Sequence, residues 1–101
     1  MKIQVPESEI ADFCHRHHIR KLSLFGSVLR DDFGPDSDID VLVEFEQGHT
    51  PGLMRLAGME NELTEVLGGE RKVDLRTPQE ISRYFRDEVL SEAEVIHEQT
   101  G

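Results

Sequence analysis

The chain has 101 residues, enough for one modest hydrophobic core, so we expect a single domain over residues 1–101. Its formal net charge of −10 argues against direct nucleic-acid binding, which needs a surplus of lysine and arginine to displace counterions from phosphates. No apolar run approaches the roughly 18 residues of a membrane span, and neither a signal peptide nor a disulfide is predicted (Cys14 is the one cysteine), so we expect a cytoplasmic protein with no membrane association.

Helical and strand patterns alternate along the chain. In order, we predict a helix at 7–18, a strand at 21–25, a brief helix at 27–31, a turn cluster at 32–36, a strand at 38–45, a loop at 47–52, a helix at 53–67, a strand at 72–76, a helix starting at 77–80 and a strand at 94–98. This order favours a small mixed β-sheet with helices packed against it. The predicted fold class is α/β (α+β).

The first helix carries an apolar stripe that includes Cys14, which we therefore place in the core. Three histidines, His15, His17 and His18, lie at its end. No acidic or cysteine ligand follows at a spacing suited to a metal site, so we interpret these histidines as residues of a helix surface.

The last helix has a strong start signal in Thr77–Glu80, with Thr77 as cap, proline at the first position and glutamate closing a capping box. Tyr84 and Phe85 follow at helical spacing, so we predict that both are packing residues. Arg86 beside them is predicted to be solvated.

Gly26 and Ser27 lie between a predicted strand and a predicted helix. Glycine lets the backbone turn sharply and approach a ligand closely. The start of a helix presents unpaired N–H groups that attract phosphate, and the serine hydroxyl adds one more donor. Taken alone, this dipeptide is weak evidence, because most such pairs form ordinary turns.

Asp38 and Asp40 project from the same side of the predicted strand 38–45, with Ile39 and the later apolar residues on the opposite side. Carboxylate oxygens are the hard ligands that Mg²⁺ prefers, and the ion keeps positions for water and substrate phosphates. Asp74 lies in a strand of similar character and joins the pair if the two strands are neighbours. Clustering three acids costs about 4 kcal/mol per close pair at an effective dielectric near 20, which favours a cation site over a solvated strand face.

A calcium-binding loop is excluded, although Asp36, Asp38 and Asp40 have its early spacing. Such a loop needs glycine at its sixth position and glutamate at its twelfth. This chain has Val41 and Gln47 there.

Gly26-Ser27, followed after ten residues by Asp38-Ile39-Asp40, resembles the signature of the DNA polymerase β-like nucleotidyltransferases. More narrowly, the chain resembles the minimal nucleotidyltransferase (MNT) antitoxins that are paired with HEPN toxins. This resemblance covers nearly the whole chain. It implies the polymerase β-like fold and a transfer of AMP from ATP to a tyrosine hydroxyl of a partner HEPN toxin.

The same resemblance implies roles for individual residues. Asp38, Asp40 and Asp74 are expected to bind two Mg²⁺ ions and to be catalytic, Gly26 and Ser27 to contact the triphosphate, and Arg30 to support the turn or contact the nucleotide. Two alternatives stay open. In the first, the chain is an antitoxin that neutralises its partner by docking alone, which its acidity would suit. In the second, it is a small-molecule nucleotidyltransferase, although it lacks room for an acceptor-binding domain.

Overall fold

A computed structural model describes residues 3–30, 34 and 36–99 of the protein. A four-stranded sheet in the order β3-β2-β1-β4 forms its centre. The strands are β1 (Ile19–Phe25), β2 (Ile39–Phe45), β3 (Val73–Arg76) and β4 (Glu94–Glu98). β2 and β3 are parallel and the other pairs are antiparallel, so the predicted small mixed sheet is confirmed.

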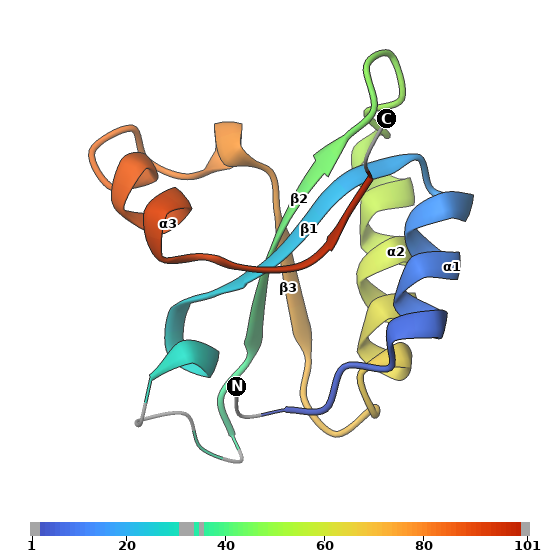
Figure 1. The fold of residues 1–101 in the computed structure, drawn as a ribbon, viewed down its shortest axis with the longest axis horizontal. Coiled ribbons are helices and arrows are strands. Elements are labelled where there is room, and N and C mark those ends of the chain that lie inside the picture. Colours follow the sequence, from blue (N-terminus) through green and yellow to red (C-terminus); the bar gives the residue numbers. More distant parts are fainter. Residues whose placement is uncertain (1–2, 31–33, 35, 100–101) are drawn as a thin grey trace.

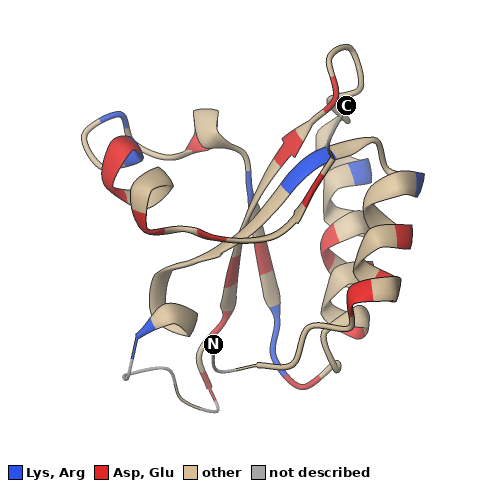
Figure 2. Ribbon diagram, in the orientation of Figure 1, with Lys and Arg blue, Asp and Glu red and all other residues tan. Residues whose placement is uncertain are grey.

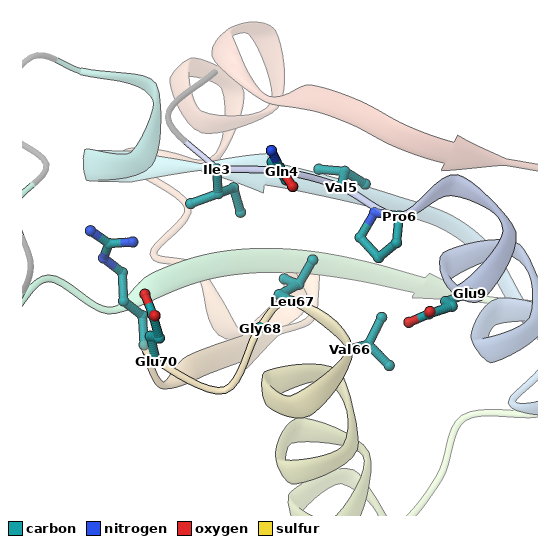
Figure 3. Close-up of a pocket in the computed structure, with 10 residues that line it drawn as sticks. Ile3, Gln4, Val5, Pro6, Glu9, Val66, Leu67, Gly68 and Glu70 are labelled. Atoms are coloured by element: carbon teal, nitrogen blue, oxygen red, sulfur yellow. The ribbon is translucent and has the colours of Figure 1, made fainter.

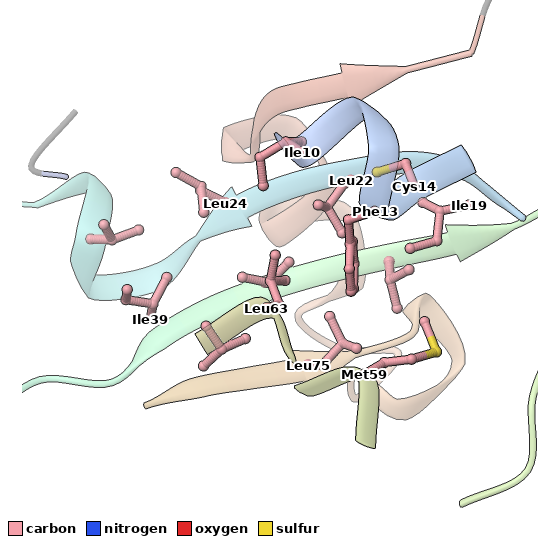
Figure 4. Packing of buried hydrophobic residues seen from close by; sticks show 14 residues of the cluster. Ile10, Phe13, Cys14, Ile19, Leu22, Leu24, Ile39, Met59, Leu63 and Leu75 are labelled. Atoms are coloured by element: carbon pink, nitrogen blue, oxygen red, sulfur yellow. The ribbon is translucent and has the colours of Figure 1, made fainter. Parts of the chain in front are cut away.

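Two helices, α1 (Glu7–Arg16) and α2 (Leu53–Val66), cover one face of the sheet, and α3 (Arg86–Glu92) lies on its other side (Figure 1). The buried cluster fills the space between the sheet and the first two helices (Figure 4). Strand alternation explains this arrangement, because Ile39, Val41 and Val43 of β2 all belong to the cluster. The intervening residues of β2, Asp40 among them, therefore project from the opposite face.

Cys14 is fully buried in the cluster, as predicted. Burial raises the pKa of its thiol to about 12, because the thiolate would have to form without solvation. The cysteine is thus an unreactive packing residue at neutral pH.

The first helix ends at Arg16, two residues before its predicted end. His18 adopts a left-handed backbone conformation with φ of 56°, and β1 begins directly after it. His17 is only partly exposed, with 15% of its side chain accessible. Its ring packs against Phe13 with centroids 4.8 Å apart, and its Nε2 lies 2.9 Å from Oε1 of Glu62, so the histidine links α1 to α2.

The brief helix predicted at 27–31 is a 3₁₀ helix, η1, over Gly26–Leu29. Its predicted last residue lies outside the described part of the chain, as do three of the five residues of the turn cluster 32–36. Within the described residues, no helix is long and apolar enough to cross a membrane.

The helix predicted to start at 77–80 is interrupted. The capping box forms, but it opens only a three-residue 3₁₀ helix, η2 (Pro78–Glu80), and the backbone is extended at Ile81. The guanidinium of Arg86 donates hydrogen bonds to the carbonyl oxygens of Pro78 (2.8 Å) and Ile81 (3.1 Å). The prediction that Arg86 is solvated is therefore wrong, because its side chain closes the loop that separates η2 from α3.

Tyr84 and Phe85 were predicted to pack, and this prediction is also wrong. Their exposed fractions are 80% and 60%. Because the helix is broken before them, neither residue lies on a stripe directed at the core. Two exposed aromatic rings thus stand at the start of α3.

Candidate active site

Asp40 and Asp74 lie side by side on the face of the sheet opposite α1 and α2, which we call the open face. Asp40 in β2 is the register partner of Asp74 in β3 and, on its other side, of Phe25 in β1. Neighbouring strands are about 4.8 Å apart, so the two carboxylates project side by side. Figure 2 shows the acidic bands adjacent on β2 and β3. The sequence predicted that Asp74 joins the other acids if its strand pairs with the strand of Asp40, and β2 and β3 do pair.

Asp38 immediately precedes β2 and is exposed. Its charge still acts on Asp40, whose pKa is raised first by burial, then by the negative charge of Asp74, and then by that of Asp38. Two cations, Arg76 and Arg30, oppose the rise. The three predicted acids are therefore electrostatically coupled through Asp40, whose ionised form its two neighbours disfavour.

The glycine turn lies against Asp40. Gly26 has φ of 76°, a conformation that favours glycine. A Cβ placed there would collide with Oδ2 of Asp40 and would lie 3.3 Å from its Cγ. Glycine is thus required twice, for the backbone conformation and for the close approach of the carboxylate. Ser27 is the second residue of η1 and Arg30 caps its C-terminal end, where the Arg30 N–H donates to the Ser27 carbonyl oxygen at 2.9 Å.

Asp74 forms a two-point ion pair with Arg76. The Arg76 Nε lies 3.1 Å from Oδ1 of Asp74, and Nη2 lies 3.2 Å from Oδ2. In the parts of the chain that the structure describes, no three His, Cys, Asp or Glu side chains are arranged to hold a metal ion. Three carboxylates are nevertheless the oxygen donors that Mg²⁺ prefers. Arg76 therefore competes with any cation for the Asp74 carboxylate.

A hollow of about 760 Å³ lies away from the acidic residues, between residues 3–6 and the end of α2 (Figure 3). Ile3, Val5 and Leu67 line it, and all three pack against the core cluster. None of the predicted site residues borders it. We interpret it as a groove over the edge of the core.

Comparison with known proteins identifies the family and the fold. The family model described as a nucleotidyltransferase domain matches residues 7–96. The chain belongs to this nucleotidyltransferase family. A Methanocaldococcus jannaschii protein, whose name proposes protein adenylyltransferase activity, is 38% identical over 92% of this chain and 96% of its own length.

Two solved structures have the same fold as this nucleotidyltransferase. A toxin–antitoxin complex with AMP-PNP matches with a TM-score of 0.72 at 20% identity, over 94% of this chain and 75% of the other. A complex of the tri-AMPylated Shewanella oneidensis HEPN toxin with its MNT antitoxin matches with a TM-score of 0.64 at 19% identity, over 92% and 70%.

The nucleotidyltransferase sheet is held at its β3 edge by two α2 side chains that sequence reasoning did not assign. Oε2 of Glu60 accepts a hydrogen bond from the Leu75 N–H at 2.7 Å, and Oγ1 of Thr64 accepts one from the Val73 N–H at 3.0 Å. These N–H groups flank Asp74 and point away from β2. Glu60 was visible in the sequence as the one charged member of the apolar stripe of 53–67, which was the available signal.

Replacing Glu60 with alanine should destabilise the domain by about 1–3 kcal/mol, because the Leu75 N–H loses its acceptor. Since the same bond positions β3, transfer activity should fall as well. Urea unfolding measures the first effect and a transfer assay the second. Glu60→Gln keeps an acceptor oxygen and should lose less of both, while exposed Glu65→Ala on the same helix should change neither. Equal losses in Glu60→Ala and Glu65→Ala would contradict the assigned contact.

Proposed function

We propose that this nucleotidyltransferase is a protein-modifying antitoxin, which transfers AMP from ATP to a tyrosine hydroxyl of a partner HEPN toxin. The observation that carries the proposal is the contact of Asp40 with the Gly26 turn on one side and its pairing with Asp74 on the other. This arrangement sets a candidate phosphate site beside candidate metal ligands. The names of the relatives supply the acceptor class, since one similar complex contains an AMPylated HEPN toxin.

In the proposed reaction, Asp38, Asp40 and Asp74 hold two Mg²⁺ ions with the triphosphate. When bound, the ions lower the pKa of the acceptor hydroxyl and neutralise charge on the phosphates. The hydroxyl oxygen forms a bond to the α-phosphorus, the bond to the departing pyrophosphate breaks, and the hydroxyl proton leaves to a carboxylate or to water. The backbone N–H groups at Gly26 and Ser27 orient the triphosphate, which supplies much of the rate through positioning.

Local positive charge supports a polyphosphate at this acidic chain. The net charge of −10 would repel ATP from the molecule as a whole. Arg30 and Arg76 both act electrostatically on Asp40, so two cations border the proposed site. We propose Arg30 as a nucleotide contact and the whole of residues 1–101 as one catalytic domain.

The direct test incubates the chain with α-labelled ATP, Mg²⁺ and a partner HEPN protein. We expect label on a tyrosine of the partner, and no label with Asp38→Ala. Asp12→Ala is the control, because this aspartate lies on α1 and pairs with Arg16 at 2.9 Å. Tight association of the two proteins without any labelling would instead support neutralisation by docking. Labelling of a small molecule without the protein partner would support the third hypothesis.

Arg76 should compete with the divalent ion for Asp74. We expect Arg76→Gln to raise the affinity for Mn²⁺ several-fold in the absence of nucleotide, the effect of removing an exposed pair worth up to ~1 kcal/mol. Titration followed by electron paramagnetic resonance measures free Mn²⁺ directly. Arg20→Gln is the matched control, since Arg20 pairs with Glu44 at 2.6 Å on two other strand positions. Unchanged or weaker Mn²⁺ binding in Arg76→Gln would show that this arginine does not compete with the ion for the Asp74 carboxylate.

A further inference from the structure

A pocket of about 290 Å³ lies between the glycine turn and α3. Phe25, Gly26 and Arg30 form the wall on the side of the glycine turn, and Phe85 and Val89 line the pocket on the side of α3. Phe25 is the register neighbour of Asp40, and Gly26 contacts the same carboxylate. The pocket therefore adjoins the proposed phosphate site without a break.

The residues contributed by the α3 segment follow one helical face. Phe85, Glu88, Val89 and Glu92 are spaced as i, i+3, i+4 and i+7, and all four line the pocket. Phe85 is 60% exposed, which is a large exposed fraction for an aromatic ring that borders a hollow. An aromatic ring, an aliphatic side chain and two carboxylates thus line the α3 side of a space open to solvent, and Arg30 lines the side of the glycine turn.

The chemistry of this lining selects its occupant. The carboxylates of Glu88 and Glu92 on the α3 side repel phosphate, whereas Arg30 lies on the side of the glycine turn, so the polyphosphate of a bound nucleotide belongs at the turn and not against α3. An aromatic ring stacks on any nucleobase. Ionised carboxylates only accept hydrogen bonds, so they favour a base that presents an exocyclic amine over one that presents a carbonyl oxygen.

Building on the proposed function, we propose that this pocket binds the nucleobase. Phe85 stacks on the base, and Glu88 and Glu92 select for the 6-amino group of adenine. The ribose bridges the pocket and the glycine turn. Base preference is then set by Phe85 and by the residues of α3 that line the pocket, and Phe85 is a specificity residue of the site.

The first test measures binding of Mg²⁺–AMP-PNP and of Mg²⁺–tripolyphosphate to the whole chain by calorimetry. Phe85→Ala should weaken AMP-PNP about tenfold and leave tripolyphosphate unchanged, because the latter has no base. Tyr84→Ala is the matched control, since this neighbouring ring is 80% exposed and does not line the pocket. Far-ultraviolet circular dichroism checks that both variants are folded.

The second test compares ATP with inosine triphosphate, which carries a 6-oxo group in place of the 6-amino group. The wild-type chain should prefer ATP, and Glu88→Gln with Glu92→Gln should reduce that preference several-fold, because an amide can also donate. Asp87→Asn, an exposed substitution on the same helix, should keep the preference.

The outcomes separate this inference from the proposed function. If the wild-type chain binds neither AMP-PNP nor tripolyphosphate, the nucleotide site and the base pocket both fail. If it binds the two equally well, or if Phe85→Ala and Tyr84→Ala behave alike, the base does not occupy this pocket although the enzyme proposal stands. A Phe85→Ala variant that loses only its protein partner would assign the pocket to partner docking and would overturn the inference.

Discussion

Asp40→Asn is expected to abolish nucleotidyl transfer while making the metal-free protein more stable. The carboxylate is the central member of the three acids, with the glycine turn on one side and Asp74 on the other. Removing a proposed ligand of ions that would supply several kcal/mol of transition-state stabilisation should lower the transfer rate on the order of 10³-fold. Asparagine has nearly the same shape, so packing should be preserved.

The gain in stability follows from the direction of the pKa shift. Burial and the neighbouring acids raise the pKa of Asp40, so the folded state holds its proton more tightly than the unfolded chain does. The free energy of unfolding therefore falls as pH rises from the ordinary aspartate pKa through the raised one, and the penalty is present where the carboxylate is ionised. The neutral amide removes this penalty, which should raise the thermal midpoint at pH 7 on the order of 2–4 °C.

Thermal unfolding at pH 7 and at pH 3, without divalent ions, checks this result. The gain should shrink at pH 3, where the wild-type carboxylate is protonated. Asp12→Asn is the control. The exposed carboxylate of Asp12 is paired with Arg16, so its removal should leave the thermal midpoint unchanged or lower it slightly. A destabilised Asp40→Asn at pH 7 would mean that the acids do not repel one another, and the case for a cation site would fail.

Gly26→Ala should reduce transfer by about 10²-fold or more. The added Cβ collides with the Asp40 carboxylate, so the side chain must rotate or the turn must move. A displacement near 1 Å at a catalytic group costs about this factor. The left-handed backbone at φ 76° should also cost about 1 kcal/mol of stability for a residue other than glycine.

Gly48→Ala separates the two effects. Gly48 has a similar φ of 83°, but a Cβ there would meet nothing within 4 Å. This variant should lose the same ~1 kcal/mol through its backbone and keep its transfer rate. Urea unfolding and the labelled-ATP assay, run on both variants, make the comparison. If Gly26→Ala transfers AMP as fast as Gly48→Ala, the close approach to Asp40 has no catalytic role.

Patterns within a few residues predicted most of the fold. The alternation over 38–45 placed Ile39, Val41 and Val43 in the core, and it set Asp40 on the open face, as the structure has them. The spacing of two aspartates and a glycine turn selected the family that the comparisons confirm. These signals succeed because strand geometry alone fixes which side each residue faces.

Features that depend on distant contacts were not predictable in the same way. A capping box marks where a helix begins but not how long it continues, and here Arg86 binds the carbonyls that a longer helix would have used. The exposure of Phe85 follows from that interruption. Glu60 has a role only because β3 lies at the edge of the sheet, which the strand order decides and no local pattern reveals.

The two hydrogen bonds from β3 to α2 also affect self-association of the protein through the edges of its sheet. A border strand with free N–H groups is a template on which a second chain can add a strand, the first step of aggregation. Thr64 and Glu60 occupy the outward N–H groups of Val73 and Leu75, so these two donors are not available to a second chain. On the opposite border, β4 begins and ends with glutamate, and like charges keep approaching strands apart. Both borders of a sheet this small are thereby protected against self-association.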